Sequence, residues 1–473
     1  MNFDPKQILA DIDHHYSHDI EPVLKQYIRI PNKSPLFDPN WEQNGHMFKA
    51  AALLQDWCKR QSVQGLEIET LQLPGRTPVL FLTIPGRAPG NVLMYGHFDK
   101  QPEFTGWDEG LSPWEPVVRD GKLYGRGGAD DGYAIFSSLL SILLLQKYKI
   151  PHATCHILIE GSEESGSIDL PFYVEHLGPK LGEPDLVVCL DAECANYDQF
   201  WLTTSLRGNL VGTLKVAVLS EGVHSGMATG IAPSAVRVLR HLLDRVENSL
   251  TGDITVESLY SPIPQNRVKE ASQAASVLGG SVAGKLPFLE GVEAISDNPT
   301  ELLLNSTWKP TLAITGAAGL PALVSAGNVL LPEVALKLSL RLPPTLDADK
   351  AAIEIKQILE ANPPYQAKVS FTVESSQAGW HAPELAPWLS AALQAGSGAF
   401  FGRDAMMMGT GGSIPFIGML GKRYPNTQFL VTGILGPHSN AHGPNEFLHL
   451  EAVRKLTGCV ISVLAEHAKQ TPR

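Results

Sequence analysis

The sequence predicts an α/β protein: a mostly parallel sheet with helices on both faces, plus an inserted α+β domain. Three observations predict this fold class. Apolar strand-like runs alternate with helical patterns up to about residue 207, polar and apolar residues then alternate within strands, and the first pattern returns near the C-terminus. The expected domains are a discontinuous one, 1–207 with 381–473, and an inserted one, 208–380.

The first domain contains helices and strands in regular alternation. The apolar spacing predicts helices over 5–29 and 44–62. Apolar strand-like runs follow, with Gly and Pro between them, at 66–73, 78–84, 91–96, 153–161 and 185–191. A long helix at about 131–148 and a short one at 170–177 lie between the last three strands. Helices that separate strands in this way favour a parallel sheet covered on both faces.

The inserted domain has a different pattern. The segments LVGTLKVAVLS (210–220) and EVALKLSLRLP (333–343) alternate apolar and polar residues. This alternation is typical of a sheet with one solvent-exposed face, and helices predicted over 233–247 and 348–361 would cover the other face. The stretch 251–310 is irregular, and no element is predicted there.

Composition excludes several classes of function. A net charge of -12 argues against nucleic acid as a partner, because backbone phosphate binding requires a basic surface. The N-terminus lacks the basic start and apolar core of a signal peptide, and the longest apolar stretch, 134–145, is too short to span a bilayer. No membrane partner is therefore expected. The five cysteines are an odd number and form no CxxC pair, so neither a disulfide framework nor a cysteine zinc site is expected. A reducing cytoplasm is therefore the expected compartment.

Polar residues follow the apolar strands at the point where each strand ends. Ligands bind at the carboxyl ends of the strands in such sheets, so these positions are candidates for a functional site. The candidates are His97 and Asp99 in GHFD, Asp130 and Asp131 in GRGGADD, Glu163 and Glu164 in GSEESGS, Asp191 after DLVVCL, and His438 and His442 in HSNAHGPNEF.

Each candidate has an ordinary explanation when it is taken alone. Asp131 could cap a helix, and Glu163 with Glu164 could lie in a solvated loop. Four carboxylate-bearing strand ends that meet at one edge would repel one another without a compensating cation. Mixed histidine and carboxylate ligands suit borderline divalent metals such as zinc. The sequence therefore predicts a metal site, with two ions favoured over one.

The motifs GHFD, YGRGGAD, EESGS, the strand end at Asp191 and HGPNE occur in one order between about residues 91 and 450. In that order they resemble the metallopeptidase family of carnosinases, aminoacylases and succinyl-diaminopimelate desuccinylase. The resemblance implies that 1–207 with 381–473 is a metal-binding catalytic domain. It implies that 208–380 is a lid and dimerisation domain.

The resemblance also implies two divalent metal ions, zinc first, with manganese or cobalt as alternatives. Each histidine ligand then belongs to one metal, one carboxylate bridges both, and one further carboxylate completes each site. The matching positions are His97, His442, the bridging Asp130, Glu164 and Asp191. The context HGPNEF favours His442 over His438, which is expected to be a loop histidine.

Further roles follow from the same resemblance. Glu163 matches the general base that takes a proton from a water bridging the two metals and passes it to the leaving amine. Asp99 matches the residue that holds the imidazole of His97 and is expected to lie behind that ring, off the metal. The resemblance implies a cis peptide bond after Asp130. Two departures stand out: the family often has Asp-x-Lys-Gly where this chain has Asp130-Asp131-Gly132-Tyr133, and Lys100 stands where an apolar residue is commoner.

Four segments bear on the substrate. His224 in EGVHSGMATG could be a turn residue, but the resemblance makes it a lid histidine that polarises the scissile carbonyl in a neighbouring subunit, which requires a homodimer. Arg341 in LSLRLPP could be a surface charge, but it matches an arginine that binds a substrate carboxylate. The glycine-rich turn GTGGSIPF lacks the lysine of a phosphate loop, so its amides are candidates to hold a carboxylate. The remaining candidates are Gly411, Gly412, Ser413 and Asn328.

These expectations describe a metal-dependent hydrolase that cleaves the amide bond of dipeptides or short peptides with a free C-terminal carboxylate. The length of the inserted domain favours the carnosinase-like dipeptidase branch. A deacylase of N-acyl amino acids, succinyl- or acetyl-, remains an alternative, because both reactions cleave an amide beside a carboxylate. An inactive binding or scaffold relative is disfavoured, because all five ligand positions and Glu163 are present.

Overall fold

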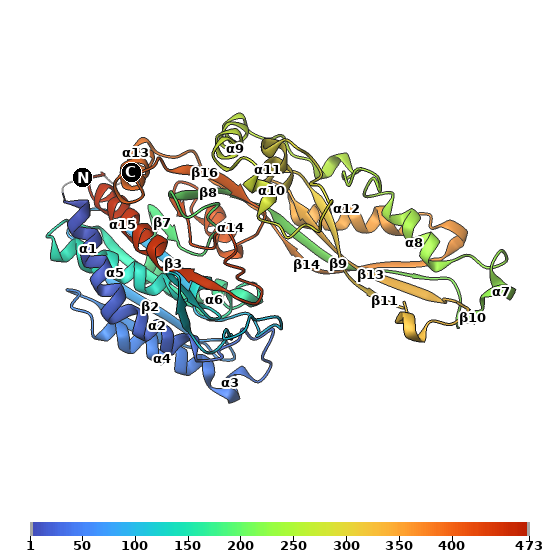
Figure 1. Cartoon of the computed structure of the whole chain (residues 1–473), viewed down its shortest axis with the longest axis horizontal. Coiled ribbons are helices and arrows are strands. Elements are labelled where there is room, and N and C mark those ends of the chain that lie inside the picture. The colour runs from blue at the N-terminus through green and yellow to red at the C-terminus, as the bar shows by residue number, and fades with distance from the viewer. Residues whose placement is uncertain (1–2, 471–473) are drawn as a thin grey trace.

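A computed structural model describes residues 3–470 as a compact part with a long arm attached to it (Figure 1). The compact part is built on a six-stranded sheet in the order β1-β2-β6-β3-β7-β17. The strands β6, β3, β7 and β17 are parallel to one another, whereas β2 is antiparallel to both β1 and β6. The bounds are β1 Glu67–Leu71, β2 Val79–Ile84, β3 Asn91–His97, β6 Thr154–Glu160, β7 Leu186–Cys189 and β17 Gln428–Val431.

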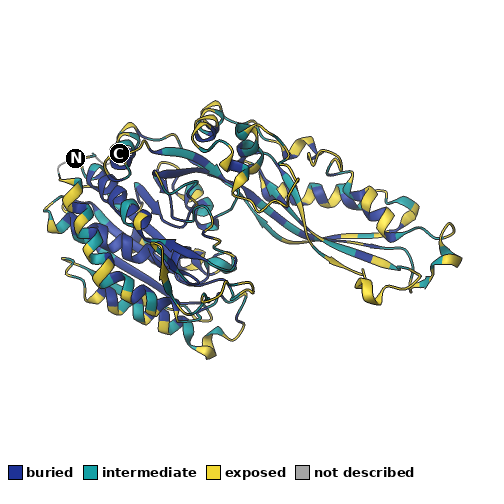
Figure 2. Ribbon diagram, in the orientation of Figure 1, coloured by how far each residue is buried: buried dark blue, intermediate teal, exposed yellow. Residues whose placement is uncertain are grey.

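Helices cover both faces of this sheet because its strands are apolar on both sides. Val92 and Met94 of β3 pack into one buried core with the helices of the N-terminus and C-terminus, and Leu93 and Tyr95 pack into a second core on the other face. The first core is covered by α1 Pro5–His15, α2 Glu21–Ile28, α4 His46–Lys59, α5 Ala134–Lys147, α13 Pro387–Phe400 and α15 Leu450–His467. The second is covered by α6 Leu170–Leu181 and α14 Pro415–Arg423. The predicted fold class is confirmed (Figure 2).

Most of the predicted elements form, with shifted ends. The helix expected over 5–29 is α1 and α2 joined by a π-helical turn, Tyr16–Ile20, and a short α3, Trp41–Asn44, precedes α4. The helix expected from 131 begins three residues later, because Gly128–Gly132 forms an irregular π-turn in which Asp130 and Asp131 have non-helical dihedrals. The stretch 128–147 is long and apolar enough to cross a membrane, but its most apolar window is entirely buried inside the fold.

Two small sheets extend the compact part. One has the order β15-β8-β16 and the other β18-β5-β4. Their bounds are β4 Val117–Arg119, β5 Lys122–Tyr124, β8 Trp201–Leu206, β15 Trp380–His381, β16 Met406–Thr410 and β18 Phe447–His449.

The stretch 251–310, for which no element was predicted, contains three helices. They are α9 Gln265–Leu278, α10 Ser281–Gly284 and α11 Pro299–Thr307. Their apolar residues pack with Trp201 and Met408 of β8 and β16 and not on the sheet of the arm. The apolar face of α9 consists largely of alanines, Ala271, Ala274 and Ala275, so its periodic signal is weak.

The arm is an antiparallel sheet in the order β11-β13-β9-β14, with α8 and α12 on one face (Figure 1). The bounds are β9 Gly208–Ala217, β11 Thr311–Ala318, β13 Glu333–Leu342, β14 Lys368–Gln377, α8 Ala235–Leu243 and α12 Ala348–Glu360. Alternate residues of β9 are buried, as the alternating sequence predicts. The far end of the arm holds α7 Ser225–Ala228 and the strand pair β10 Val223–His224 and β12 Val329–Leu330.

Candidate metal centre

The carboxyl ends of the parallel strands bring the predicted residues together. His97 is the last residue of β3 and pairs in register with Glu160, the last residue of β6, and Asp191 follows β7 by two residues. Gly96 permits this approach, because a Cβ there would lie 2.6 Å from Asp131 Oδ2 and 2.5 Å from the Cβ of Ala134. The start of α5 can therefore lie directly against the end of β3.

Three side chains form a first group. Nε2 of His97 lies 3.1 Å from Oδ1 of Asp130 and 3.7 Å from Oδ1 of Asp191, and all three side chains are buried. Their donor atoms lie within 4.8 Å of one another. This spacing suits a single cation among them.

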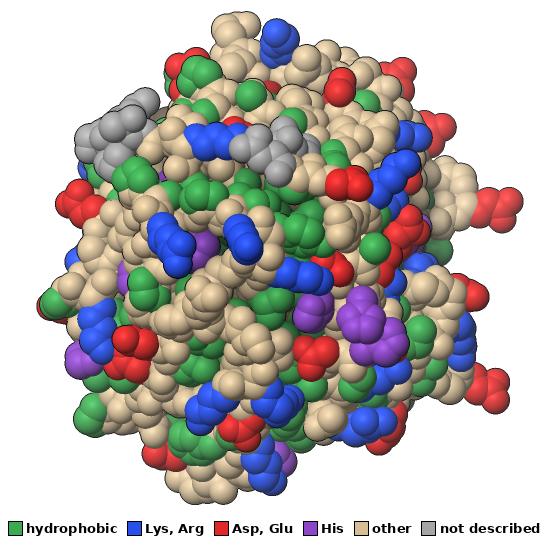
Figure 3. Space-filling model, turned by 90° about the vertical axis from the view of Figure 1, so that its left-hand side faces the viewer, with side chains coloured by type: hydrophobic (Ala, Val, Ile, Leu, Met, Phe, Trp, Pro, Cys, Tyr) green, Lys and Arg blue, Asp and Glu red, His purple; other side chains and the backbone are tan. Residues whose placement is uncertain are grey.

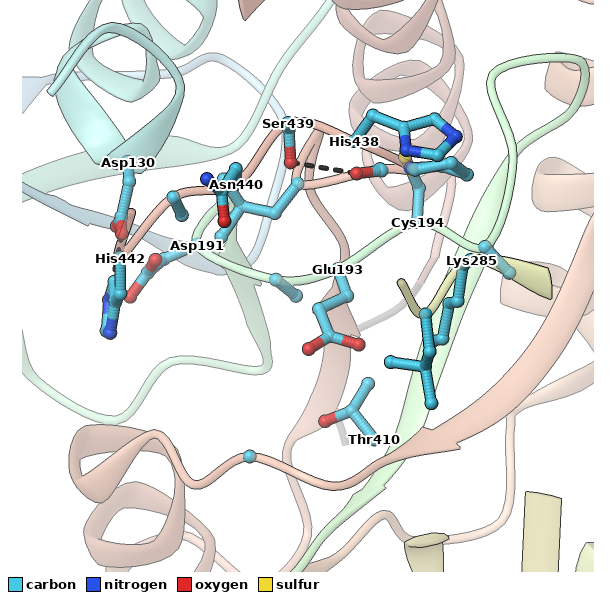
Figure 4. A pocket seen from close by; sticks show the side chains of 18 of the residues that line it. Asp130, Asp191, Glu193, Cys194, Lys285, Thr410, His438, Ser439, Asn440 and His442 are labelled. Carbon is cyan, nitrogen blue, oxygen red and sulfur yellow. Dashed lines mark hydrogen bonds and ion pairs between the residues drawn. The ribbon is translucent and has the colours of Figure 1, made fainter. Parts of the chain in front are cut away.

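A second group shares Asp130 with the first. Its other oxygen, Oδ2, lies 3.1 Å from Nε2 of His442, and the same nitrogen lies 3.3 Å from Oε2 of Glu164. The two oxygens of Asp130 thus face different groups, as a carboxylate between two metals would. Figure 4 shows Asp130, Asp191 and His442 together at one side of the cavity, and His438 on the other side with its ring turned away from them.

Asp99 lies on the far side of the His97 ring. Nδ1 of His97 donates a hydrogen bond to the backbone carbonyl of Asp99 at 3.1 Å and lies 3.4 Å from its carboxylate. Because a carbonyl oxygen only accepts, Nδ1 carries the proton and Nε2 faces the carboxylates. The Asp99 carboxylate also accepts the backbone N–H groups of Glu163 at 3.1 Å and Glu164 at 3.0 Å. One residue, Asp99, therefore orients the histidine and the two glutamates.

The carboxylates of the site repel one another strongly. Burial, and then the nearby Asp191, raises the pKa of Glu163 well above its ordinary value. Burial, and then Asp130, does the same to the pKa of Glu164. Burial would also raise the pKa of Asp130, but hydrogen bonds from His442 and His97 lower it below its ordinary range. Carboxylates in such mutual repulsion require positive charge among them.

The donor set fits a pair of divalent cations. Within residues 3–470, Oε1 of Glu164 is a buried oxygen without a hydrogen-bond partner, although buried polar atoms nearly always have one, and Oδ2 of Asp130 has only its 3.1 Å contact with Nε2 of His442. Histidine nitrogen with carboxylate oxygen is the ligand chemistry of zinc and similar ions. The residues that could hold them are His97, Asp130 and Asp191 for one ion, and Asp130, Glu164 and His442 for the other.

Glu163 faces a cavity next to both groups. The cavity has a volume of about 890 Å³, and Glu163 lines it together with Asp130, Asp191 and His442. No hydrogen bond joins the Glu163 carboxylate to any other side chain in the described part of the chain, so it is free to accept a proton.

A buried ion pair holds the two loops that carry Asp130 and His442. Nη1 of Arg126 lies 2.7 Å from Oε2 of Glu446, and both side chains are fully buried. Oε1 of Glu446 accepts the backbone N–H groups of Gly127 at 3.0 Å and of Asp130 at 3.3 Å. The Arg126 guanidinium also donates to the carbonyls of the two residues that flank His442, Ala441 and Gly443.

Two residues next to Asp99 contact the site or its support. Gln101 donates a hydrogen bond from Nε2 to Oε2 of Glu164. Lys100 points the other way: Nζ donates to the carbonyls of Tyr27 and Ile30, at 2.8 Å each. Lys100, the departure from the family pattern, therefore binds the C-terminal end of α2 and contacts no candidate ligand through its ammonium group.

The predicted substrate residues lie in different places. Gly412 and Ser413 line the cavity with the candidate ligands. Gly411 accepts a hydrogen bond at its carbonyl from Nε of Arg207. Arg341 is half-buried on β13, where burial lowers its pKa and Glu193, which lines the cavity, raises it.

His224 and Asn328 lie at the far end of the arm. His224 pairs in register with Val329, and Ser225 N–H donates to the carbonyl of Asn328 at 2.8 Å. Neither residue lines the cavity in the single chain. Of the predicted site residues, these two are the ones that the fold places far from the metal groups (Figure 1).

Sequence reasoning missed several residues that contact the site. They are Gln101, Arg126, Glu193, Arg207 and Glu446. Gln101 could have been found, because His97, Asp99 and Gln101 alternate along one extended segment. Glu446 lies within the quoted HGPNEF motif and Arg126 within YGRGGAD, so each was adjacent to a predicted ligand.

The chain is similar to known proteins in sequence and in fold. A model of Peptidase family M20/M25/M40 matches residues 93–466. The cysteinylglycine-S-conjugate dipeptidase of Corynebacterium striatum is 26% identical over 367 residues, 76% of this chain and 77% of that protein. The human Beta-Ala-His dipeptidase is 24% identical over 98% of this chain and 93% of its own length. The structure of the dipeptidase Dug1p of Saccharomyces cerevisiae superposes with a TM-score of 0.79 over the full length of both chains, at 21% identity.

Proposed function

Because the chain belongs to Peptidase family M20/M25/M40, we propose that it is a binuclear metallopeptidase that hydrolyses dipeptides with a free C-terminal carboxylate. The observation that carries this proposal is the position of Asp130, whose two oxygens face two separate groups of candidate ligands beside Glu163. Zinc is the proposed metal, with manganese or cobalt as alternatives.

The proposed chemistry assigns a role to each side chain. Two bound divalent ions would polarise the scissile carbonyl and lower the pKa of an attacking water. Glu163 accepts the proton of that water and delivers it to the leaving amine, which its free carboxylate and its place in the cavity beside both groups support. Asp99 keeps the proton of His97 on Nδ1, so that Nε2 remains available as a ligand.

The substrate is proposed to be a small peptide held by its C-terminal carboxylate. Gly412 and Ser413 line the cavity and can present polar groups to a carboxylate, and Arg341 lies within electrostatic range of the cavity residue Glu193. The relatives named above are dipeptidases, which supports a dipeptide over an N-acyl amino acid. Deacylation of acetyl- or succinyl-amino acids is the alternative that the assay below includes.

We further propose a cytoplasmic homodimer. The five cysteines are free and buried, which suits a reducing compartment. His224 lies at the exposed end of the arm, so it could reach the cavity of a second copy but lines none in its own. In that position it would polarise the substrate carbonyl of the partner.

The variant Glu163→Gln tests the proposal. It keeps the shape of the side chain but removes the proton acceptor, so we expect hydrolysis of dipeptides to fall by about 10²–10⁴-fold with both metals still bound. The measurement is the turnover of a dipeptide panel beside N-acetyl and N-succinyl amino acids, with metal content determined by mass spectrometry. Turnover that survives both chelation and Glu163→Gln would overturn the mechanism, and preference for N-acyl substrates would replace dipeptidase with deacylase.

A further inference from the structure

A pair of exposed histidines lies on the outer surface of the N-terminal helix. His14 is in the last turn of α1 and His18 is in the π-helical turn that follows, four residues later. Their rings stack with centroids 4.4 Å apart and planes inclined by 29°. Histidine side chains gather on one part of the face shown in Figure 3, at the end of the molecule where α1 lies.

A hydrogen bond at Nδ1 of His18 leaves Nε2 available as a metal ligand. Nδ1 of His18 lies 2.9 Å from the carbonyl oxygen of His14. Because this oxygen only accepts, Nδ1 carries the proton and Nε2 keeps its lone pair. Histidines that bind metals in proteins commonly donate their other ring N–H to a carbonyl or carboxylate in the same way.

The backbone under the two rings is held in place by the core. Ile12, Tyr16 and Ile20 are buried on the opposite face of the segment, and the Tyr16 hydroxyl bonds Oγ of Ser137 at 2.6 Å. Two histidines four residues apart on one helical face can chelate one metal, as in the zinc-binding HExxH motif. The two rings are already stacked, and the core already holds the backbone beneath them. Chelation of a metal therefore requires little further ordering of this segment.

The neighbouring carboxylates have partners other than His14 and His18. The Asp19 carboxylate accepts from Nε1 of Trp57 at 2.9 Å and from Gln61 at 3.1 Å, and Asp13 lies 3.7 Å from Arg454. Among residues 3–470, the groups of three or more close ligand atoms are the two at the metal centre. The pair therefore offers two imidazole nitrogens, and solvent would complete the coordination.

We propose that His14 and His18 form a surface chelate for one divalent transition metal of the kind that imidazole favours, such as Ni²⁺, Cu²⁺ or Zn²⁺. The site is separate from the metal centre and shares no residue with it. It lies on the helical layer of the compact part. Metal binding at His14 and His18 is therefore independent of peptide hydrolysis.

Calorimetric titration with Ni²⁺ tests this site, on untagged enzyme that has been zinc-loaded and then dialysed until it holds two zinc ions per chain, and zinc release is measured in the same samples. We expect one Ni²⁺ to bind per chain without loss of zinc, and His14→Ala or His18→Ala to weaken that binding at least about tenfold. His241→Ala, which removes a single exposed histidine on α8, is the matched control and should change nothing. Nickel uptake that persists in the variant carrying both His14→Ala and His18→Ala, uptake that only replaces zinc, or no uptake at all would overturn the proposal.

Discussion

Lys100 shows how one residue supports the site without belonging to it. Its side chain is fully buried, and its ammonium group lies 3.9 Å from the centre of the Tyr27 ring. Burial lowers the pKa of Lys100 well below its ordinary value, so the amine depends on the carbonyls at the end of α2 for its partners. The carbonyl of Tyr27 lies in the last turn of α2, where carbonyl oxygens carry the partial negative charge of the helix. The residue thus joins α2 to the segment that presents His97 and Asp99.

Replacement of Lys100 by Met should destabilise the fold but leave the metal ligands in place. We expect the free energy of unfolding to fall by about 1–3 kcal/mol, because the buried carbonyls lose the hydrogen-bond donor that Nζ supplies. Urea denaturation measures this, and metal content should stay at the wild-type value. Lys180→Met, at an exposed ion pair with Glu69, is the control and should cost under about 1 kcal/mol. Loss of metal at unchanged stability would instead place Lys100 in the metal site.

At the scale of elements, the pairing of β5 with β18 assembles the second metal group. Phe447 pairs with Tyr124, so the loop after β5 and the loop before β18 lie side by side. Asp130 is on the first loop and His442 on the second. The Arg126–Glu446 pair then ties the backbones of both loops together.

Arg126→Met should therefore affect one metal more than the other. It leaves the Glu446 charge buried and unpaired, which costs about 3–5 kcal/mol. It also frees the loop that carries His442, so we expect the affinity for the second metal to fall about 10–100-fold while the first is retained. Competition with a zinc-binding dye measures both affinities.

The double variant Arg126→Met with Glu446→Leu separates charge from position. It should recover part of the stability, because no charge is left buried, but it should not restore the second metal. Two metals bound with wild-type affinity by the single variant would show that the ion pair does not position His442.

At the scale of the whole molecule, the arm places His224 away from the cavity of its own chain. The end of the arm is apolar and open: Ile231 is 86% exposed, and Leu323 and Val324 are each 95% exposed. An exposed apolar surface of this kind marks a contact with another molecule. The shape of the chain thus supports a site completed by the arm of a second copy.

Mixing two inactive variants tests this arrangement. His224→Ala should lower turnover by about 10²–10³-fold, and Glu163→Gln should lower it at least as strongly. In a two-fold dimer with shared sites, one site of each mixed dimer carries both changes and the other carries neither. Re-associated mixtures should therefore recover about a quarter of wild-type activity, as measured by dipeptide turnover. Activity no higher than that of the separate variants would place His224 in its own chain or outside catalysis.

The fold and the candidate ligands could be predicted because both depend on short-range pattern. Apolar strands end in His97 and Asp191, and parallel pairing necessarily brings such ends to one edge. The longest helix between 265 and 307, α9, was missed because small alanines carry its packing. The Arg126–Glu446 pair was missed for another reason: 320 residues separate its members, and a single polar contact leaves no periodic signal.

The central claim is that Asp130 is shared by two metal ions. A crystal structure of the zinc-loaded protein, with anomalous diffraction recorded at the zinc edge, tests it most directly. We expect two peaks about 3.5–4 Å apart, with one oxygen of Asp130 on each, His97 and Asp191 at one peak, and Glu164 and His442 at the other. A single peak, or two peaks of which only one contacts Asp130, would contradict the account.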